Sequence, residues 1–424
     1  MRRRMNVTSK AHTVRKKWNK NFALITLLLF LLFIFNFVEI DIEIGDDTSW
    51  SSGPNGGSSN TIGRRSRPSS QSKELETVQL MTVSCGKPNY QGIRDVRKPL
   101  DQSLTMIKSA ALFCQKKLHI HIFTEEDMKP LFKEEIDSWP KNVLKRVKYT
   151  LHDAEYQEIP EELKNQWKGW YKPCGSFRLL TPHILPKFDV QAAIYSDSDV
   201  IWTRPIDQLW DELSEFEENQ VMGVSPTAGH PLGGSRLNEN FIMHNTGLFQ
   251  INTGVMLMNF TKINQADWFL PHDEVKRERP GEPVKWGSDL LIPYYQKYKD
   301  KAEHDQKLMN IVFHYNPHLL RQLNCHWNFK TNFCMDENNI CQSAEDQGPG
   351  AVHGITSAFF GHEHPTFKAL YETFKAYEWD RNLNDALVGV FEDVVERTAK
   401  HTFCGRKSSF IGKVLRESCG VARL

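Results

Sequence analysis

The stretch Ala192-Ala193-Ile194-Tyr195-Ser196-Asp197-Ser198-Asp199-Val200-Ile201-Trp202 predicts an apolar strand that carries two carboxylates two residues apart. In extended backbone, residues i and i+2 project from the same face, so Asp197 and Asp199 are expected to point at one spot beside the strand's carboxyl end. Paired carboxylates suit Mg²⁺ or Mn²⁺ held together with the phosphates of a nucleotide. The simpler alternative is a strand ending in a solvated acidic turn, because aspartate is also a common turn residue.

Strand and helix patterns alternate after residue 77. The expected strands are residues 78–85, 118–124, 147–152 and 192–202, and the expected helices are residues 100–114 and 176–184. This alternation predicts an α/β fold with a mostly parallel sheet covered by helices on both faces. Ligands of such sheets bind outside the carboxyl ends of the strands. The segments Ser84-Cys85-Gly86 and Asp197-Ser198-Asp199 should therefore face one crevice.

The N-terminal region has the pattern of a membrane anchor. Residues 1–20 carry eight basic and no acidic side chains, and residues 22–38 are almost wholly apolar, close to the roughly 17–25 residues that span a bilayer. No small-x-small cleavage site follows, so a cleaved signal peptide is disfavoured. We expect a cytoplasmic tail (1–21), a transmembrane signal anchor (22–39), a flexible stem (40–76) and a single lumenal catalytic domain (77–424). A buried helix of a soluble domain is the alternative.

The charge balance differs between the tail and the rest of the chain. The formal net charge is +1, and subtracting the eight basic residues of the tail leaves −7 for the remainder. A nucleic-acid partner would need a basic surface to neutralise phosphates. The composition therefore argues against nucleic-acid binding.

Eight cysteines follow the expected anchor: Cys85, Cys114, Cys174, Cys325, Cys334, Cys341, Cys404 and Cys419. An even number in an oxidising compartment favours disulfides. A zinc site built from Cys325, Cys334, Cys341 and His326 is the rival interpretation, although no Cys-x₂-Cys pair is present. Asn259-Phe260-Thr261 is the one lumenal N-glycosylation sequon, so Asn259 is the expected glycosylation site.

Several motifs resemble glycosyltransferase family 8, in the order in which that family has them: Tyr195-Ser196-Asp197-Ser198-Asp199-Val200, Asn252-Thr253-Gly254-Val255-Met256-Leu257-Met258-Asn259, His304-Asp305-Gln306-Lys307-Leu308-Met309-Asn310 and Val352-His353-Gly354. Further stretches, among them Tyr171-Lys172-Pro173-Cys174-Gly175-Ser176-Phe177-Arg178-Leu179 and Cys325-His326-Trp327-Asn328, are similar to the glucoside xylosyltransferases. The resemblance covers about residues 78–410.

The resemblance implies a GT-A-type, Rossmann-like fold and a retaining enzyme. It implies transfer of xylose from UDP-xylose to O-linked glucose on EGF-like repeats of Notch-type proteins, forming an α-1,3 linkage. The implied cofactor is Mn²⁺, held by Asp197, Asp199 and His353. The implied location is the endoplasmic reticulum or Golgi membrane, in a single-pass type II arrangement with the catalytic domain in the lumen.

Other site residues follow from the same resemblance. Those expected to bind the donor, besides the two carboxylates, are Val83, Ser84, Cys85, Arg178, Ser198, Asn252, Gly254 and Gly354. The catalytic candidates are Asp305 and Gln306, with Asp289 as a further carboxylate. Lys307 stands where the family has a second aspartate, which puts in doubt any role for a carboxylate there.

Two other functions stay open at this point. One is a different lumenal member of family 8, either an enzyme that extends xylosyl-xylose or a glucosyltransferase. The other is a membrane-tethered binding protein that keeps the fold without catalysis.

Overall fold

The computed structural model describes residues 77–88, 91–170, 174–227, 251–271, 283–300, 302–335 and 341–422. The expected tail, anchor and stem lie outside these residues, so the domain boundaries stay predictions. Within the described part of the chain, every helix is too short or too polar to span a membrane.

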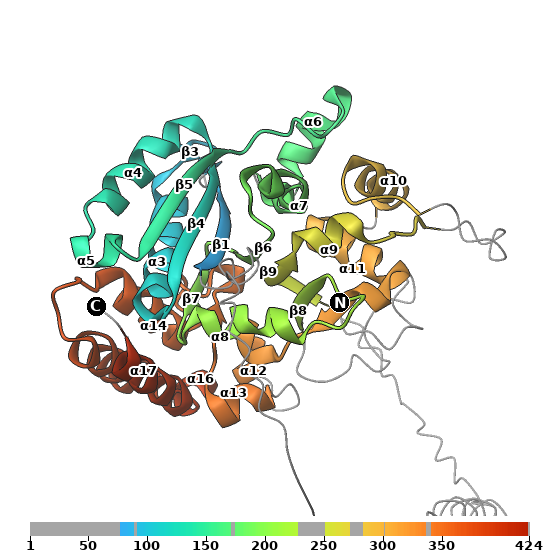
Figure 1. Ribbon diagram of the computed structural model, residues 1–424. Coiled ribbons are helices and arrows are strands. Elements are labelled where there is room, and N and C mark those ends of the chain that lie inside the picture. Colours follow the sequence, from blue (N-terminus) through green and yellow to red (C-terminus); the bar gives the residue numbers. More distant parts are fainter. Residues whose placement is uncertain are drawn as a thin grey trace, which may run out of the picture. The chain divides into compact units, whose positions relative to one another are not determined.

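A seven-stranded sheet forms the centre of this region, in the order β10-β8-β9-β6-β1-β4-β5 (Figure 1). Every pair of neighbours is parallel except those of β9, which runs antiparallel to both β6 and β8. The prediction of a mostly parallel α/β fold is confirmed. The strands are β1 (Thr77–Ser84), β4 (Lys117–Thr124), β5 (Val147–Asp153), β6 (Ala192–Ser196), β8 (Met222–Pro226), β9 (Ile251–Asn259) and β10 (Leu320–Gln322).

Both faces of the sheet are covered, which explains why the strands are apolar on both sides. Leu80 and Ile122 contribute to a core with one set of helices, α3 (Arg97–Phe113), α4 (Lys129–Asp137), α5 (Lys141–Leu144) and α8 (Ile206–Asp211). On the opposite face, Met81 and Phe123 contribute to a core with α6 (Glu161–Gly169), α9 (Phe260–Gln265), α10 (Ser288–Tyr298) and α11 (Asp305–Tyr315).

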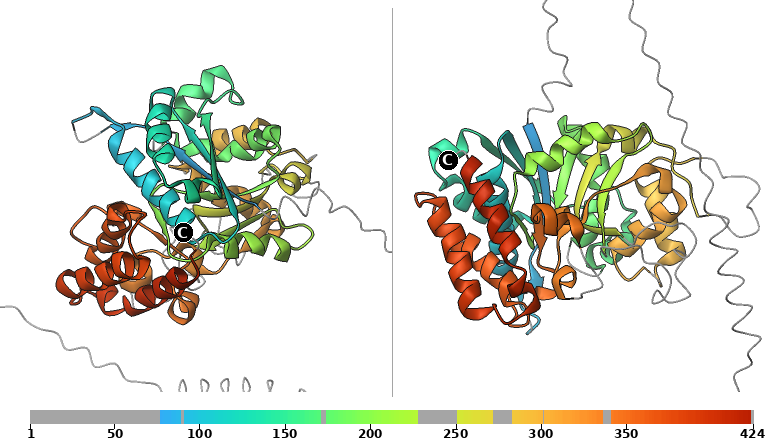
Figure 2. Two further views of the ribbon diagram at one scale, coloured as in Figure 1. Left: turned by 60° about the vertical axis from the view of Figure 1, so that its left-hand side comes forward. Right: turned by 90° about the horizontal axis from the view of Figure 1, so that it is seen from below.

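A group of C-terminal helices forms a third core, beyond α3 (Figure 2). Helix α14 (Pro365–Ala376) contacts both α3 and the short strand β7 (Val200–Trp202). Strand β7 pairs antiparallel with β11 (Ala351–His353) in a small second sheet. Besides α14, the helices of this C-terminal group are α12 (Asn332–Met335), α13 (Gln342–Gln347), α15 (Val390–Thr398), α16 (Phe403–Arg406) and α17 (Ser409–Val421).

Two elements differ from the sequence prediction. Residues 192–202 form two strands in two sheets, because the chain turns at Asp197-Ser198-Asp199 between β6 and β7. The prediction of one continuous strand was wrong: aspartate is compatible with a turn, and the pairing of β7 with β11 selects the turn here. Residues 176–184 form a 3₁₀ turn, η2 (Gly175–Leu179), and a short helix, α7 (Thr181–Ile184).

Six of the eight cysteines form disulfides: Cys85–Cys174, Cys325–Cys341 and Cys334–Cys404. Cys114 and Cys419 are free and buried, so full pairing does not occur. Because Cys325, Cys334 and Cys341 are all oxidised, the zinc interpretation is excluded.

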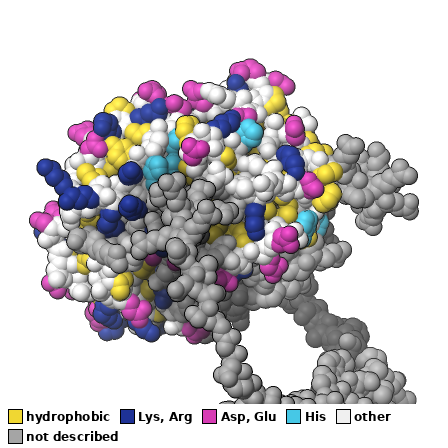
Figure 3. Space-filling view, in the orientation of Figure 1, with side chains coloured by type: hydrophobic (Ala, Val, Ile, Leu, Met, Phe, Trp, Pro, Cys, Tyr) yellow, Lys and Arg dark blue, Asp and Glu magenta, His cyan; other side chains and the backbone are white. Residues whose placement is uncertain are grey.

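Charges of both signs are interspersed on the face of the molecule drawn in Figure 3. On this face, the Lys and Arg side chains do not gather into one basic patch separate from the Asp and Glu side chains.

Candidate active site

The register of the small sheet brings the Asp-x-Asp turn to a distant histidine. Strand β7 begins directly after Asp199, and its first residue, Val200, pairs with His353 at the end of β11. The peptide N–H of Gly354 then donates to the carbonyl oxygen of Asp199 at 2.7 Å. Backbone pairing therefore brings together residues that are more than 150 positions apart in the sequence.

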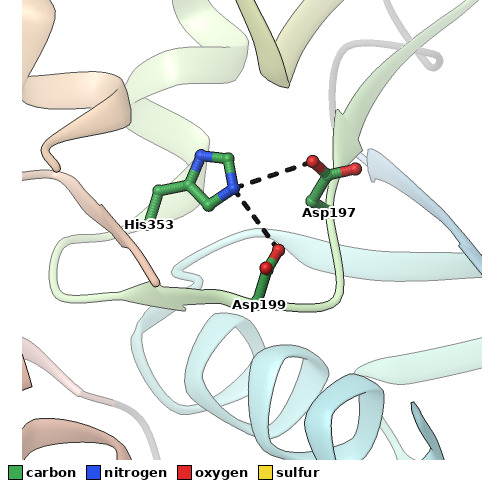
Figure 4. A group of neighbouring side chains, drawn as sticks. All are labelled: Asp197, Asp199 and His353. Carbon is green, nitrogen blue, oxygen red and sulfur yellow. Dashed lines mark ion pairs between the residues drawn. The ribbon is translucent and has the colours of Figure 1, made fainter. Parts of the chain in front are cut away.

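The three side chains converge on one point (Figure 4). Nε2 of His353 lies 3.3 Å from Oδ1 of Asp199 and 3.7 Å from Oδ2 of Asp197. The ligand atoms all lie within 4.8 Å of one another, and no other group of this kind occurs among the described residues. His353 is buried, while both carboxylates are about a quarter exposed.

This donor set fits a divalent cation. Carboxylate oxygens suit Mg²⁺ and Mn²⁺, whereas an imidazole nitrogen favours a transition metal over Mg²⁺. Three protein ligands at one face leave further coordination positions for substrate oxygens, as catalytic metal sites require. These residues could therefore hold one ion beside the pocket.

Two hydrogen-bond donors hold Oδ1 of Asp197, the carboxylate oxygen that does not face His353. The hydroxyl of Tyr195 donates to Oδ1 at 2.5 Å, and Nη1 of Arg178 donates to the same atom at 2.9 Å. With Oδ1 engaged in this way, Oδ2 faces His353. Burial and the nearby carboxylate of Asp197 raise the pKa of Tyr195 well above its ordinary value, so the phenol keeps its proton.

Arg178 joins Asp197 to a second carboxylate. Its Nε donates to Asp305, and its Nη1 also donates to the carbonyl oxygen of Thr253 at 3.1 Å. Burial alone would lower the pKa of Arg178, but the charges of Asp305 and Asp197 outweigh it and raise that pKa well above the usual range. The cation is permanent, and it sits between two carboxylates.

A cavity of about 250 Å³ opens in front of these groups, at the carboxyl ends of the strands. Most of the predicted site residues line it: Val83, Ser84, Cys85, Arg178, Asp197, Ser198, Asp199, Asn252, Asp305, Gln306 and His353. The predicted crevice between the end of β1 and the Asp-x-Asp turn is therefore present.

Gly254 and Gly354 do not line the cavity. A Cβ on Gly254 would overlap the ring of His353, and a Cβ on Gly354 would overlap the ring of Phe359. Gly254 allows the histidine to approach, and Gly354 allows the next aromatic side chain to pack. Their positions indicate a packing role, while a direct donor contact stays a prediction.

The catalytic candidates lie in different surroundings. Asp305 is 2 % exposed, and its negative charge is offset by Arg178. Gln306 accepts from the peptide N–H of Thr253 at 3.2 Å through its side-chain oxygen. Asp289 is exposed and is not part of the cavity wall.

Lys307 is directed to the surface. It pairs with Glu303, four residues earlier in the chain and outside the helix, at 2.6 Å, and it does not line the cavity. The departure from the family pattern thus falls on a residue outside the pocket.

Several cavity residues escaped the sequence analysis: Lys87, Pro99, Gly175, Tyr195, His304, Ile355 and Thr356. Tyr195 could have been found, since it precedes Asp197 by two residues in the strand and shares its face. Thr356 and Ser357 have φ values of 51° and 62°, a left-handed conformation that is unfavourable for a β-branched residue. No sequence signal marks that conformation.

Asn259 caps a helix in the folded protein. Its side-chain oxygen accepts from the N–H of Lys262 at 2.9 Å at the start of α9. Thr261, the third residue of the sequon, donates its hydroxyl to Gln191 at 2.6 Å. Glycosylation of Asn259 stays a prediction.

The α/β sheet and the carboxylate–histidine group beside its cavity define a protein with a candidate divalent-cation site at the carboxyl ends of the strands. Glucoside xylosyltransferase 1 of Danio rerio is 32 % identical over 353 residues, which cover 83 % of this chain and 80 % of that protein. Glucoside xylosyltransferase 1 of Homo sapiens is 32 % identical over 347 residues, covering 81 % and 72 %. The chain therefore belongs to the glucoside xylosyltransferase family and is an enzyme of the xylosyltransferase class.

Two other comparisons are less informative. The crystal structure of mouse xyloside xylosyltransferase 1 in its apo form superposes with a TM-score of 0.41 at 15 % identity, covering 66 % of this chain and 98 % of that one. No protein-family model matches the chain. The strand order defines the fold, and the sequence relatives show the family.

Proposed function

We propose that this enzyme transfers xylose from UDP-xylose to O-linked glucose on EGF-like repeats of Notch-type proteins, with retention of configuration and an α-1,3 linkage. The observation that carries the proposal is the convergence of Asp197, Asp199 and His353 beside a cavity, in a chain of this family. The closest alternatives within the same chemistry are another donor sugar or another acceptor.

The proposed cofactor is Mn²⁺, held by the two aspartates and His353. When bound, it would supply Lewis-acid stabilisation of the charge that grows on the departing diphosphate, worth several kcal/mol. Arg178 adds a buried cation to the same wall, and its link to Asp197 orients that carboxylate toward His353. The end of β1 at Val83 and Ser84 is the proposed position of the uridine.

Retention of configuration needs either a protein nucleophile or a front-face displacement. In the first, a carboxylate attacks the anomeric carbon and forms a covalent intermediate. Asp305 is poorly suited to this because its charge is paired with Arg178. We therefore favour front-face displacement, in which the leaving phosphate accepts the proton of the acceptor hydroxyl, with Gln306 positioning the sugar.

We place the enzyme in the lumen of the endoplasmic reticulum or Golgi, attached by the predicted anchor at residues 22–39. Three disulfides in the described residues support an oxidising compartment. A glycosylation tag after the C-terminus should be modified, and one before Arg2 should not.

A donor panel on defined acceptors tests the function. The purified full chain is incubated with Mn²⁺ and UDP-xylose, UDP-glucose or UDP-galactose. The acceptors are an EGF-like repeat bearing O-glucose, the bare repeat, and the repeat already bearing xylosyl-glucose. Mass spectrometry should show one pentose added from UDP-xylose to the glucosylated repeat alone.

The other outcomes each point to an alternative. Pentose added only to xylosyl-glucose would identify an extending enzyme, and hexose transfer would identify a glucosyltransferase. No transfer with any donor, together with binding of the glucosylated repeat, would identify a binding protein that lacks catalysis.

A further inference from the structure

We propose that Asn328 is a positioning residue that holds His353 in the tautomer whose Nε2 lone pair faces Asp197 and Asp199. Asn328 ends the 3₁₀ turn η8 (Cys325–Asn328) and is fully buried. It does not line the cavity. The proposal rests on the metal site of the proposed function, and it assigns a role to a residue behind that site.

The donor and acceptor roles can be assigned from a backbone group outward. The peptide N–H of Gly254 can only donate, and it lies 2.9 Å from one side-chain atom of Asn252. That atom must be the amide oxygen. The same oxygen lies 2.8 Å from a side-chain atom of Asn328, which must therefore be the amide nitrogen.

The assignment then reaches the histidine. With its nitrogen turned toward Asn252, Asn328 presents its oxygen to Nδ1 of His353 at 2.9 Å. An amide oxygen only accepts, so Nδ1 carries the proton. Nε2 of the neutral ring is then left with its lone pair, and this is the nitrogen that faces both carboxylates. Hydrogen bonding at one ring nitrogen commonly fixes the metal-binding nitrogen in this way.

Backbone hydrogen bonds hold Asn328 next to His353. Phe329 donates its N–H to Ala351 at 2.8 Å and accepts from the N–H of His353 at 2.7 Å. Asn328 is therefore held beside the strand that carries the histidine. Gly254 contributes twice, because it supplies the N–H that orients Asn252 and leaves the space that the imidazole occupies.

With this tautomer, three electron-rich atoms point at one spot, an arrangement that a bound cation would stabilise. Rotation of Asn328 or loss of its oxygen would release this constraint. The proton could then sit on Nε2, where it would block the ligand position. Asn328 thus acts on metal affinity through His353 without contacting the donor.

Direct Mn²⁺ titration at saturating UDP, followed by the electron paramagnetic resonance signal of free Mn²⁺, tests this without an activity assay. The full-length chain is compared with Asn328→Ala, His353→Ala and Asn316→Ala. Asn316 is the matched control, since it is equally buried, bonds the backbone of Phe269 and Val312, and does not line the cavity. We expect Asn328→Ala to weaken Mn²⁺ binding roughly 10- to 100-fold, and Asn316→Ala to leave it unchanged.

The controls separate the two proposals. If the wild type binds Mn²⁺ no better than His353→Ala, the metal site itself fails, and the role of Asn328 with it. If His353→Ala weakens binding and Asn328→Ala does not, only the role of Asn328 is overturned. Equal losses in Asn328→Ala and Asn316→Ala also overturn it, because they indicate general loosening.

A second substitution covers the case in which Asn328→Ala does not fold. Asn328→Asp keeps an acceptor for the Nδ1 proton of His353 but loses the N–H that Asn328 donates to Asn252. The melting temperature should therefore fall, while Mn²⁺ affinity should stay close to that of the wild type. A loss as large as that of His353→Ala would contradict the proposal.

Discussion

Asp197 and His353 meet at the same point but are held there by different chemistry. Asp197 is fixed by a buried arginine and a phenol, and the arginine is in turn paired with Asp305. His353 is fixed by two neutral amides, Asn328 and Asn252. A charged anchor contributes to folding, because breaking it leaves a buried charge. A neutral anchor sets direction with little net charge, so its loss should alter metal binding more than stability.

The charged anchor offers the largest expected effect. Arg178→Met would leave Asp305 buried without its cation, which typically costs about 3–5 kcal/mol of unfolding free energy. Urea denaturation of Arg178→Met and of a control variant measures the loss of unfolding free energy. Arg397→Met is the control, because the ion pair of Arg397 with Asp393 is about two-thirds exposed and such pairs contribute only ~0–1 kcal/mol. Similar stability changes in both would contradict the distinction.

Asp199→Asn tests the ligand set with the fold left intact. A lost carboxylate ligand should reduce transition-state stabilisation by at least roughly 3 kcal/mol, or more than ~10² in rate. Initial rates at saturating Mn²⁺ and UDP-xylose provide the measurement, with the melting temperature as a check on folding. Near-full activity would show that the metal assignment to the Asp-x-Asp turn is wrong.

His353→Ala tests the neutral anchor from the other side. The Mn²⁺ concentration for half-maximal activity should rise, because the ion loses a ligand. The structure adds a stability cost of about 1–3 kcal/mol, since the buried oxygen of Asn328 loses its donor. His121→Ala is the control, because His121 is buried and bonded to His152 and Gln79. This variant should lower the stability of the protein and leave the Mn²⁺ requirement unchanged. An unchanged Mn²⁺ requirement in His353→Ala would make the histidine structural.

Tyr195→Phe gives the smallest expected effect. It removes one of two donors to Oδ1 of Asp197 and leaves Arg178 in place. A hydrogen bond to a charged group contributes about 1.5–3 kcal/mol, of which we expect half to appear in catalysis, or a fall of about 4- to 12-fold in kcat. Tyr294→Phe, which removes a buried hydroxyl bonded to Phe269, should leave kcat unchanged. Equal kcat values in the two variants would remove Tyr195 from the site.

The chain's sequence predicts four strands of the central sheet, β1, β4, β5 and β6, and one half of the site, whereas β8, β9 and β10 were not predicted. Strands β1, β4 and β5 are found within one residue of the expected positions, because each is a short run that contains β-branched residues. The two aspartates stand out as a local pair. The family resemblance adds His353, which composition and spacing would not distinguish from a structural histidine.

What could not be predicted depends on pairing between distant segments. The turn between β6 and β7 competes with continued strand, and only the β7–β11 pairing decides it. Asn328 lies in a stretch that resembles the family, but no residue pattern near it indicates a contact with His353. Its role arises because the Phe329 backbone joins β11, which no residue pattern near position 328 encodes.

The disulfide between Cys85 and Cys174 has a consequence for biogenesis. It ties the end of the first strand to the start of the segment that carries Arg178, so two walls of one cavity share a covalent crosslink. Thiol oxidation must occur before this crosslink exists. Chains produced in a reducing bacterial cytoplasm would reach the same sheet with this part of the cavity unlinked. The quality of a recombinant preparation therefore depends on oxidative maturation as much as on folding.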